Sequence, residues 1–344
     1  MNQPAQNDPI LSVRDLTVEF RIAGKWTPVV TGVSLDVASG ETLAIVGESG
    51  SGKSVTSMSL MRLLPPRQSR VSSGSIDFAG TDLLAMKRRD LNSVRGAGIS
   101  MIFQEPMTSL NPAFTVGEQI AEVVRRHKKV GRREALGTAI RTMEAVGIPQ
   151  AARRARAYPH EFSGGMRQRI MIAMAVCCEP RLLIADEPTT ALDVTIQAQI
   201  LDLLRELQHE TGMGMIFVTH DLGVVAEVAD RVVVMYAGNI VEQASVHDLY
   251  ADAAHPYTHG LLKSMPTGAR TAREGIYSIP GAPPRPVEFP VGCRFAPRCS
   301  FATAACSAPA ELIEVGVEHV ARCLRHGEID LRIEPSRPEG ALHV

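Results

Sequence analysis

Short runs of Val, Ile and Leu, punctuated by Gly and Ser, mark the first third of the chain. Two of them are LSVRDLTVEF at residues 11–20 and GVSLDVASGETLAIVG at residues 32–47. Alternating or continuous apolar runs of this kind predict β-strands. The segment KSVTSMSLMRLL, residues 53–64, follows and predicts a helix that stops at Pro65 and Pro66.

The pattern changes in the middle of the chain and then returns. Between residues 113 and 160, apolar positions recur at helical spacing among many basic residues, which predicts a helical insertion. RLLIADEP at 181–188 and MGMIFVTH at 213–220 are apolar strands, each followed by a loop and a helical pattern, as parallel sheets require. The regular pattern of apolar positions weakens from about residue 265, and the Pro-rich residues 278–292 favour a linker.

The length of the chain, 344 residues, exceeds the roughly 250 to 300 residues at which single hydrophobic cores stop growing. We therefore expect one large α/β domain with an appended piece. The chain is 45% apolar and 21% charged, which excludes disorder throughout. Its formal net charge of −1 gives no field that attracts a polyanion, so nucleic acid is not expected as a partner.

No segment of the sequence is typical of secretion or of a membrane span. The first residues, MNQPAQNDPILSV, lack a basic region followed by an apolar one. No apolar run approaches the roughly 18 residues needed to cross a bilayer. We therefore expect the reducing cytosol, where disulfides are rare and a cysteine cluster more often binds metal.

Ten Lys or Arg residues lie between Arg125 and Arg156 in the predicted helical insertion. Like charges in helices usually face water, so we expect a solvated face on a domain that docks to other subunits. A basic patch that faces lipid is the alternative.

A phosphate-binding motif lies between a predicted strand and a predicted helix. Residues 47–54, GESGSGKS, fit the pattern G-x-x-x-x-G-K-[ST]. The glycines let backbone N–H groups surround phosphate oxygens, and the start of the helix favours an anion. Lys53 can reach the β and γ phosphates, and the Ser54 hydroxyl can bind Mg²⁺. The expected nucleotide contacts in this segment are Gly47, Ser49, Gly50, Ser51, Gly52, Lys53, Ser54 and Val55.

Two carboxylates end the apolar segment LLIADE, residues 182–187. In α/β sheets, ligand chemistry is found at the C-terminal ends of such buried strands. We expect Asp186 to bind Mg²⁺ through water and Glu187 to accept a proton from an attacking water. Solvated acids are also common at strand ends, so the pair alone is weak evidence for a site. Together with the phosphate motif it becomes strong evidence.

A second stretch of small residues precedes an apolar-periodic helix in FSGGMRQRIMIAMAVCC, residues 162–178. Its Ser163, Gly164 and Gly165 form another helix N-terminus suited to anions. Three further residues continue the series of motifs: Gln104 in MIFQEPMTSLNP, Asp193 in TTALD and His220 in IFVTHD. The order of these motifs resembles that of the ATP-binding cassette (ABC) ATPases.

The resemblance covers roughly residues 10 to 265 and implies the fold. It implies an α/β P-loop NTPase of the ABC nucleotide-binding type, with a RecA-like core, an antiparallel β subdomain and an α-helical subdomain. This domain would span residues 8–265, with the helical subdomain at 105–162. Residues 266–344 would form a small Cys-rich C-terminal extension.

The resemblance also implies roles for single residues. In these ATPases two cassettes pack head to tail, so Ser163 to Gly165 of one subunit would complete the γ-phosphate site held by Lys53 of the other. Asp193 would help couple the two sites. Phe20 would stack on adenine, although a core position at a strand end is the alternative. The remaining implied roles are those of Gln104 at Mg²⁺ and the water, Glu187 as general base and His220 at the γ-phosphate.

Several stretches resemble one subgroup of these ATPases. Phe162 and Met166 flank Ser-Gly-Gly where the usual signature is Leu-Ser-Gly-Gly-Gln, a variant similar to that of peptide-importer cassettes. QEPMTSLNP after Ile102 and Phe103, HPYTHGLL at residues 255–262 and IPGAPPRP before the cysteines point the same way. All resemble the ATPase subunits of oligopeptide and dipeptide permeases, including their nickel and glutathione relatives.

This resemblance implies an ATPase subunit of a di- or oligopeptide importer that uses ATP and Mg²⁺. Its implied partners are a second cassette, identical or a sister, two transmembrane permease subunits and an extracytoplasmic substrate-binding protein. Its implied place is the cytoplasmic face of the plasma (inner) membrane. Two alternatives remain: a soluble cassette ATPase not tied to transport, and an iron or redox sensor in which ATP binding is the output.

Four cysteines gather near the C-terminus: Cys293, Cys299, Cys306 and Cys323. They are separated by five, six and sixteen residues, whereas zinc ligands usually come in close pairs. Iron–sulfur clusters accept looser spacing, and the resemblance to peptide-permease ATPases implies a [4Fe–4S] cluster, structural or sensing. Zinc and free or disulfide-linked thiols stay open. The nearby His255, His319 and His326 are spare potential ligands, but lone histidines are more often surface residues, so we expect them at the surface. Cys177 and Cys178 are expected in the core.

Overall fold

The structure is a computed structural model, and it describes residues 9–104, 109–190, 192–265 and 277–331. The expected domain boundaries at positions 8, 105, 266 and 344 lie outside the described residues. So does the middle of the stretch QEPMTSLNP, at positions 105–108.

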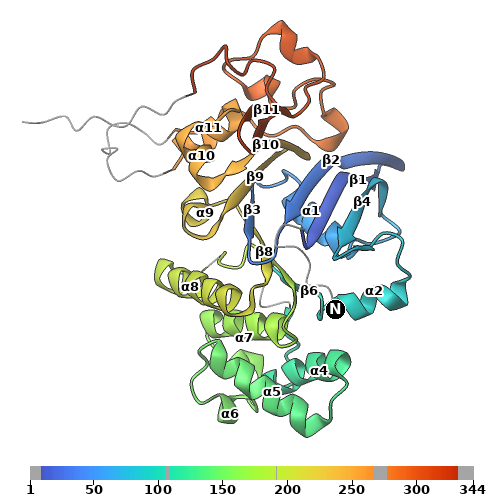
Figure 1. Cartoon of the computed structure of the whole chain (residues 1–344), viewed down its shortest axis with the longest axis vertical. Coiled ribbons are helices and arrows are strands. Elements are labelled where there is room, and N and C mark those ends of the chain that lie inside the picture. Colours follow the sequence, from blue (N-terminus) through green and yellow to red (C-terminus); the bar gives the residue numbers. More distant parts are fainter. Residues whose placement is uncertain (1–8, 105–108, 191, 266–276, 332–344) are drawn as a thin grey trace, which may run out of the picture.

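One eight-stranded sheet forms the centre of the molecule (Figure 1). Its strands are β3 (Thr42–Val46), β6 (Ile99–Ile102), β7 (Leu182–Asp186), β8 (Gly214–Thr219), β9 (Arg231–Tyr236), β10 (Asn239–Ser245), β11 (Ile313–Gly316) and β12 (His319–Ala321). Their order is β11-β12-β10-β9-β3-β8-β7-β6, and the five strands from β9 to β6 are parallel. Every residue of β3, β7 and β8 is buried, which explains their continuous apolar sequences.

The parallel arrangement places three predicted motifs at one edge of the sheet. The phosphate motif follows β3, Glu187 follows β7 and His220 follows β8. Because the carboxyl ends of parallel strands meet at the same edge, residues far apart in the sequence become neighbours there.

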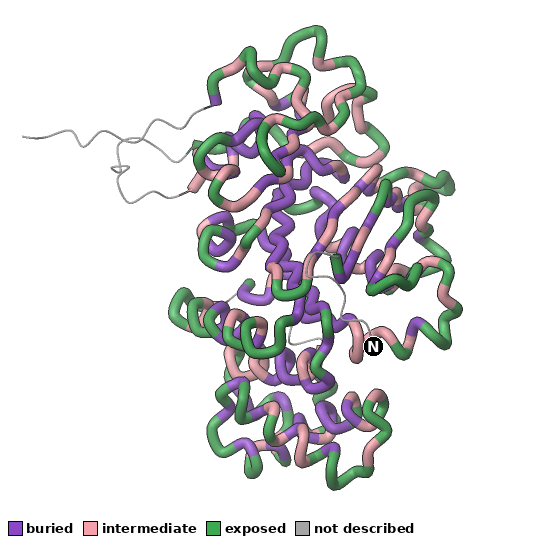
Figure 2. Tube along the Cα trace, in the orientation of Figure 1, coloured by how far each residue is buried: buried purple, intermediate pink, exposed green. Residues whose placement is uncertain are grey.

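Helices flank this sheet, and the buried residues follow its length (Figure 2). The helices that accompany it are α1 (Lys53–Leu60), α7 (Gly164–Val176), α8 (Val194–Thr211), α9 (Leu222–Val228), α10 (Val246–Ala251) and α11 (Pro256–Lys263). Cys177 and Cys178, just after α7, are 3% and 8% exposed, so their predicted core position is confirmed.

An antiparallel sheet lies beside the central one. Its strands are β1 (Leu11–Ile22), β2 (Lys25–Val37), β4 (Ser69–Phe78) and β5 (Thr81–Asp82), and α2 (Arg88–Val94) follows them. The strand order is β2-β1-β4-β5. The buried residues of β1, such as Val13 and Val18, belong to a hydrophobic core that includes Leu43 and Ile45 of the central sheet. The two sheets therefore share one core.

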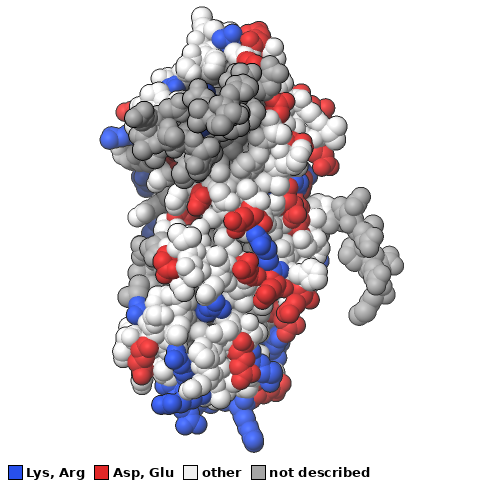
Figure 3. Space-filling model, turned by 90° about the vertical axis from the view of Figure 1, so that its left-hand side faces the viewer, with Lys and Arg blue, Asp and Glu red and all other residues white. Residues whose placement is uncertain are grey.

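A helical arm forms the end of the molecule that lies opposite the C-terminal region in Figure 1, and it confirms the predicted helical insertion. It contains α4 (Val116–Lys128), α5 (Arg132–Ala145), α6 (Ala151–Arg154) and the 3₁₀-helix η1 (Pro159–Glu161). Val116, Ile120 and Val124 form the buried stripe of α4. Lys and Arg side chains gather at this end of the surface, where most of them face solvent (Figure 3).

The C-terminal residues pack on the cassette rather than standing apart from it. They contain η2 (Pro286–Glu288), η3 (Ala296–Arg298), η4 (Ala304–Ser307) and the hairpin β11–β12. β12 pairs with β10, with Ala321 opposite Glu242, and so extends the central sheet. Ile279 of the Pro-rich stretch is 8% exposed and joins the core of this region. Ile279 is thus packed against the cassette, whereas the other residues of the Pro-rich stretch are half-buried or exposed, so a linker role for the rest of the stretch stays a prediction.

No helix among the described residues is both long enough and apolar enough to cross a membrane.

Candidate functional site

The phosphate motif forms a loop that only glycine can complete at its first position. Gly47 has φ +150°, and a Cβ there would lie 2.2 Å from the Met235 carbonyl oxygen. Gly52, with φ +104°, precedes the first residue of α1 in the left-handed region that glycine favours. The loop therefore closes tightly against β9 and points its helix N-terminus toward the edge of the sheet.

The amine of Lys53 lies inside this loop. It donates hydrogen bonds to the carbonyl oxygens of Gly47 at 2.6 Å and Glu48 at 3.1 Å. Burial lowers the pKa of Lys53, whereas the charges of Glu187, Asp186 and Glu48 act in the opposite direction. A cation held in a loop of backbone N–H groups provides the environment that phosphate oxygens require.

Ser54 and Asp186 lie together beside Lys53. The Ser54 hydroxyl donates to Oδ1 of Asp186 at 3.2 Å, which joins the start of α1 to the end of β7. Burial raises the pKa of Asp186, and this hydrogen bond opposes the rise. A hydroxyl and a carboxylate oxygen are hard donors of the kind Mg²⁺ prefers, so this pair fits the predicted metal position.

Glu187 is the centre of a second group of polar side chains. Its Oε2 accepts hydrogen bonds from Gln104 Nε2 and Thr190 Oγ1, both at 2.9 Å. Its Oε1 lies 3.4 Å from Nδ1 of His220. Glu187 itself has φ +49°, a left-handed conformation that is uncommon for a side chain of this size. The structure thus brings three of the predicted catalytic residues together from β6, β7 and β8.

Ser163 and Asp193 cap neighbouring helices. The Ser163 side chain accepts from the Met166 N–H at the start of α7, and Asp193 accepts from the Ile196 N–H at 3.0 Å at the start of α8. A Cβ on Gly165 would lie 2.8 Å from the Ile196 side chain, so the two helix starts are in close contact. Among the described residues, no hydrogen bond joins Ser163, Gly164 or Gly165 to the phosphate loop.

Gln168 is a residue whose role the sequence pattern did not reveal. It is 2% exposed and donates to the Pro188 carbonyl oxygen at 2.6 Å. This bond connects the signature helix α7 to the segment that follows Glu187. Its position within an apolar-periodic helix is the only signal in the sequence, because a polar residue there needs a buried partner.

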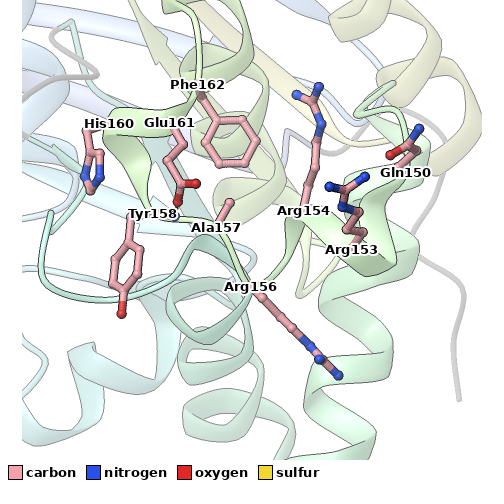
Figure 4. A pocket seen from close by; sticks show the side chains of 9 residues that line it. All are labelled: Gln150, Arg153, Arg154, Arg156, Ala157, Tyr158, His160, Glu161 and Phe162. Atoms are coloured by element: carbon pink, nitrogen blue, oxygen red, sulfur yellow. Dashed lines mark hydrogen bonds between the residues drawn. The ribbon is translucent and has the colours of Figure 1, made fainter.

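The two residues that depart from the usual signature, Phe162 and Met166, both contact Arg154. Met166 Sδ lies 2.9 Å from Nη1 of Arg154, whose guanidinium carbon is 5.8 Å from the Phe162 ring centroid. Arg154 and Phe162 also line a groove of about 750 Å³ (Figure 4). Phe162 and Met166 therefore pack together with Arg154, from the arm that carries α6.

Phe20 is half-buried in β1. It lies opposite Thr27 on β2 and Ser69 on β4, and it packs against the core of the antiparallel sheet. These contacts are those of a core side chain, so a stacking role on adenine stays a prediction.

The four cysteines of the C-terminal region line one small cavity with apolar walls. The residues around it include Cys293, Cys299, Cys306, Cys323, His255, Phe295, Phe301, Leu324 and Ile329. Burial raises the pKa of the Cys293 and Cys299 thiols, and raises that of Cys323 to about 11. Hydrogen bonds from backbone N–H groups, such as that of Phe301 to Cys299, oppose this rise.

The cavity does not have the geometry of a site for a single ion. Within the described residues, no three His, Cys, Asp or Glu side chains converge closely enough to hold one metal ion. The expected surface positions of two histidines were wrong. His255 is 1% exposed, with a pKa that burial lowers to about 3, and His319 is hydrogen-bonded to buried Glu242 at 2.8 Å.

Two parts of the chain match known protein families. Residues 30–190 match the family described as ABC transporter, and residues 241–306 match the oligopeptide/dipeptide transporter C-terminal region. A Brucella melitensis protein described as a peptide import ATP-binding protein is 54% identical over 332 residues, which cover 93% of this chain and 98% of that protein. The oligopeptide transport ATP-binding protein of Bacillus subtilis is 53% identical over 293 residues, 85% of this chain and 82% of that protein.

Solved structures share the same architecture. A cassette of an ABC transporter complex from Clostridium perfringens has a TM-score of 0.61 at 28% identity, and the match covers 71% of this chain and 91% of that chain. A bacterial ABC transporter cassette solved as a dimer has a TM-score of 0.61 at 25% identity, covering 69% of this chain and 98% of that chain.

Proposed function

The chain belongs to the ABC transporter ATPases, in the branch of the peptide import ATP-binding proteins, and from this premise we propose how its site powers the import of di- and oligopeptides. The predicted family and the predicted cassette fold are confirmed. The observation that carries the proposal is the convergence of the phosphate loop, Asp186, Glu187 and His220 at one edge of the central sheet.

The polar groups at this edge have different roles in ATP hydrolysis. The loop N–H groups and Lys53 bind and orient the phosphates of ATP. Ser54, Asp186 and Gln104 would hold Mg²⁺, which when bound neutralises phosphate charge. Glu187 accepts the proton of the attacking water, because its carboxylate is the base nearest to Gln104 and His220. His220 would contact the γ-phosphate.

A second cassette would complete the site. Ser163, Gly164 and Gly165 present the N-terminus of α7, and in the part of the chain that the structure describes they make no hydrogen bond to their own phosphate loop. A Cβ on Gly164 would meet nothing within 4 Å, so the surface there is open to a ligand held by another chain. We infer a head-to-tail dimer, with an identical or a sister cassette, in which Asp193 lies close to the boundary between the two sites.

Permease subunits would dock near Gln104. Phe103 and Phe114 are 43% and 54% exposed. Phe103 borders a groove lined by β6, α4 and α7, and Phe114 borders a second groove along α4. A permease segment seated there would contact the neighbour of Gln104, and so would sense the ATP site directly. In this arrangement the chain would lie at the cytoplasmic face of the inner membrane, and an extracytoplasmic binding protein would deliver the cargo.

Transport by reconstituted vesicles tests this function. Vesicles that contain the permease subunits, the cassettes and ATP on the cassette side should accumulate a labelled oligopeptide supplied with its binding protein. A matched preparation with Lys53→Ala cassettes should accumulate none, because the phosphates lose their cation. Equal uptake by the two preparations would contradict the proposal, and so would recovery of this chain with ribosomes or DNA in place of membrane subunits.

For the cysteine cavity we propose a [4Fe–4S] cluster rather than zinc. A cluster takes one thiolate for each of four irons, so its ligands surround a shared volume rather than converging on one point. The four thiols border one shared cavity, as the four ligands of one cluster would. When bound, the cluster would cross-link the extension; the cysteines hold it and the apolar walls exclude water.

Replacement of one cavity cysteine should remove the metal. We expect anaerobically purified protein to show the broad absorption near 400 nm typical of iron–sulfur clusters, roughly as in other such proteins, and Cys293→Ser to lose both colour and iron. Cys177→Ser is the control, because that thiol is buried beside α7, away from the cavity. Colourless wild-type protein, or iron that survives the Cys293 change, would contradict the cluster.

A further inference from the structure

A buried arginine of the C-terminal extension forms an ion pair with a residue of the phosphate loop. Arg298 is the last residue of η3, and its side chain is only 5% exposed. Its two terminal nitrogens contact both carboxylate oxygens of Glu48, at 2.6 and 3.1 Å. Glu48 is the second residue of the phosphate motif, so residues 250 positions apart form a bidentate ion pair.

The remaining donors of Arg298 fix it in place. Its Nε donates to the Pro280 carbonyl oxygen at 2.8 Å, and its other nitrogens reach Ile279 O and the Tyr236 hydroxyl at 3.3 Å. These three hydrogen bonds fix the position of the guanidinium independently of Glu48. A group held in this way determines where its carboxylate partner lies.

The backbone of Glu48 is fixed as well. Its N–H donates to the Tyr257 hydroxyl at 2.8 Å. Tyr257 packs against Tyr236 and Phe295, with ring centroids 4.6 and 5.4 Å apart. Phe295 comes from the same short segment as Arg298. The extension therefore contacts the Glu48 side chain directly, and its main chain only through Tyr257.

A second contact reaches the other side of the loop. Arg294 donates to the Ala237 carbonyl oxygen at 2.5 Å and to Thr31 Oγ1 at 3.0 Å. The next residue in that turn, Gly238, donates its N–H to Ser51 O, in the phosphate loop, at 2.8 Å. The segment bounded by Cys293 and Cys299 thus contacts the loop directly and through this turn.

We propose that Arg298 is a positioning residue for ATP binding, supplied by the C-terminal extension to the phosphate loop of the same chain. It orients Glu48, and it neutralises a carboxylate that otherwise repels the phosphates from within their own loop. The inference rests on the proposed nucleotide site, and it assigns to the extension a direct part in nucleotide affinity.

A double-mutant cycle on the full chain tests this role. Arg298→Gln leaves the Glu48 charge unpaired, so the dissociation constant of Mg²⁺-ADP should rise about tenfold, within the range for charged groups in contact. Adding Glu48→Gln removes that charge, so the double variant should recover most of the affinity. Arg298→Lys, which keeps the charge without the bidentate geometry, should lie between. In steady-state hydrolysis, KM for ATP should rise with little change in kcat.

The control is Arg231→Gln, which breaks a similar Arg–Glu pair with Glu41, at 2.8 Å, at the opposite end of β3 and β9. It should leave ADP affinity unchanged even if it lowers the unfolding temperature. Wild-type affinity in Arg298→Gln would overturn the positioning role, as would a double variant that binds no better than Arg298→Gln. Wild-type protein that binds no ADP would overturn the proposed nucleotide site itself, which separates the two failures.

Discussion

Replacement of Glu187 by Gln is expected to slow ATP hydrolysis about a thousandfold, within the range for loss of a general base, while ATP binding stays near the wild-type level. Gln has nearly the same size and can still pair with Gln104 and Thr190, so the local hydrogen bonds are largely kept. What it cannot do is accept the proton of water. Single-turnover hydrolysis and equilibrium binding of ATP, measured on the same preparation, separate these two effects.

The matched control is Glu179→Gln. Glu179 also carries a carboxylate near the central sheet, but it pairs with Lys128 at the surface, and its side chain is 75% exposed. This variant should hydrolyse ATP at the wild-type rate. If Glu187→Gln also kept wild-type turnover, Glu187 would not be the base, and another acceptor at this edge of the sheet would have to take its place.

Replacement of Gly238 by Ala should destabilise the fold more than the same change at Gly24. Both glycines have φ +81°, so both changes carry the same backbone strain. A Cβ at Gly238 would lie 1.9 Å from the Val29 carbonyl oxygen, whereas a Cβ at Gly24 would meet nothing within 4 Å. We expect Gly238→Ala to lower the free energy of unfolding by about 4 kcal/mol, the sum of strain and overpacking.

Gly24→Ala should lower the free energy of unfolding by only about 1 kcal/mol, which is the strain alone. Urea unfolding followed by circular dichroism measures both changes. Since the Gly238 N–H also supports Ser51 O in the phosphate loop, Gly238→Ala should weaken ATP binding as well. Equal losses of stability in the two variants would contradict this prediction. They would show that the turn at Gly238 can shift to accommodate a Cβ despite its close contact with Val29.

Local patterns in the sequence were sufficient to predict most of the candidate nucleotide site. Gly47 and Gly52 stand where the backbone needs conformations that other residues rarely adopt, and they do so between a strand and a helix. Asp186 and Glu187 follow a strand whose continuous apolar sequence already indicates burial. Such features depend on the backbone of a few adjacent residues, so they are visible before any folding is known.

Contacts between distant segments were not predictable in this way. The sequence marks Cys293 and Cys299, yet nothing near them indicates that Arg298 pairs with Glu48. His255 and His319 were expected at the surface, because isolated histidines usually are, but His255 at the start of α11 and His319 in β12 are both buried. Burial of a polar group depends on what packs over it, and a single segment does not contain that information.

The sequence by itself therefore determined the phosphate loop, the carboxylates and the grouping of four cysteines, because each follows from local backbone geometry or from residue spacing. The cassette fold followed from the resemblance of the ordered motifs to a known family. The tertiary structure alone decided that the C-terminal extension joins the central sheet through β12 and places Arg298 against Glu48. The physical reason is that an ion pair across 250 positions forms only when packing brings its two ends together.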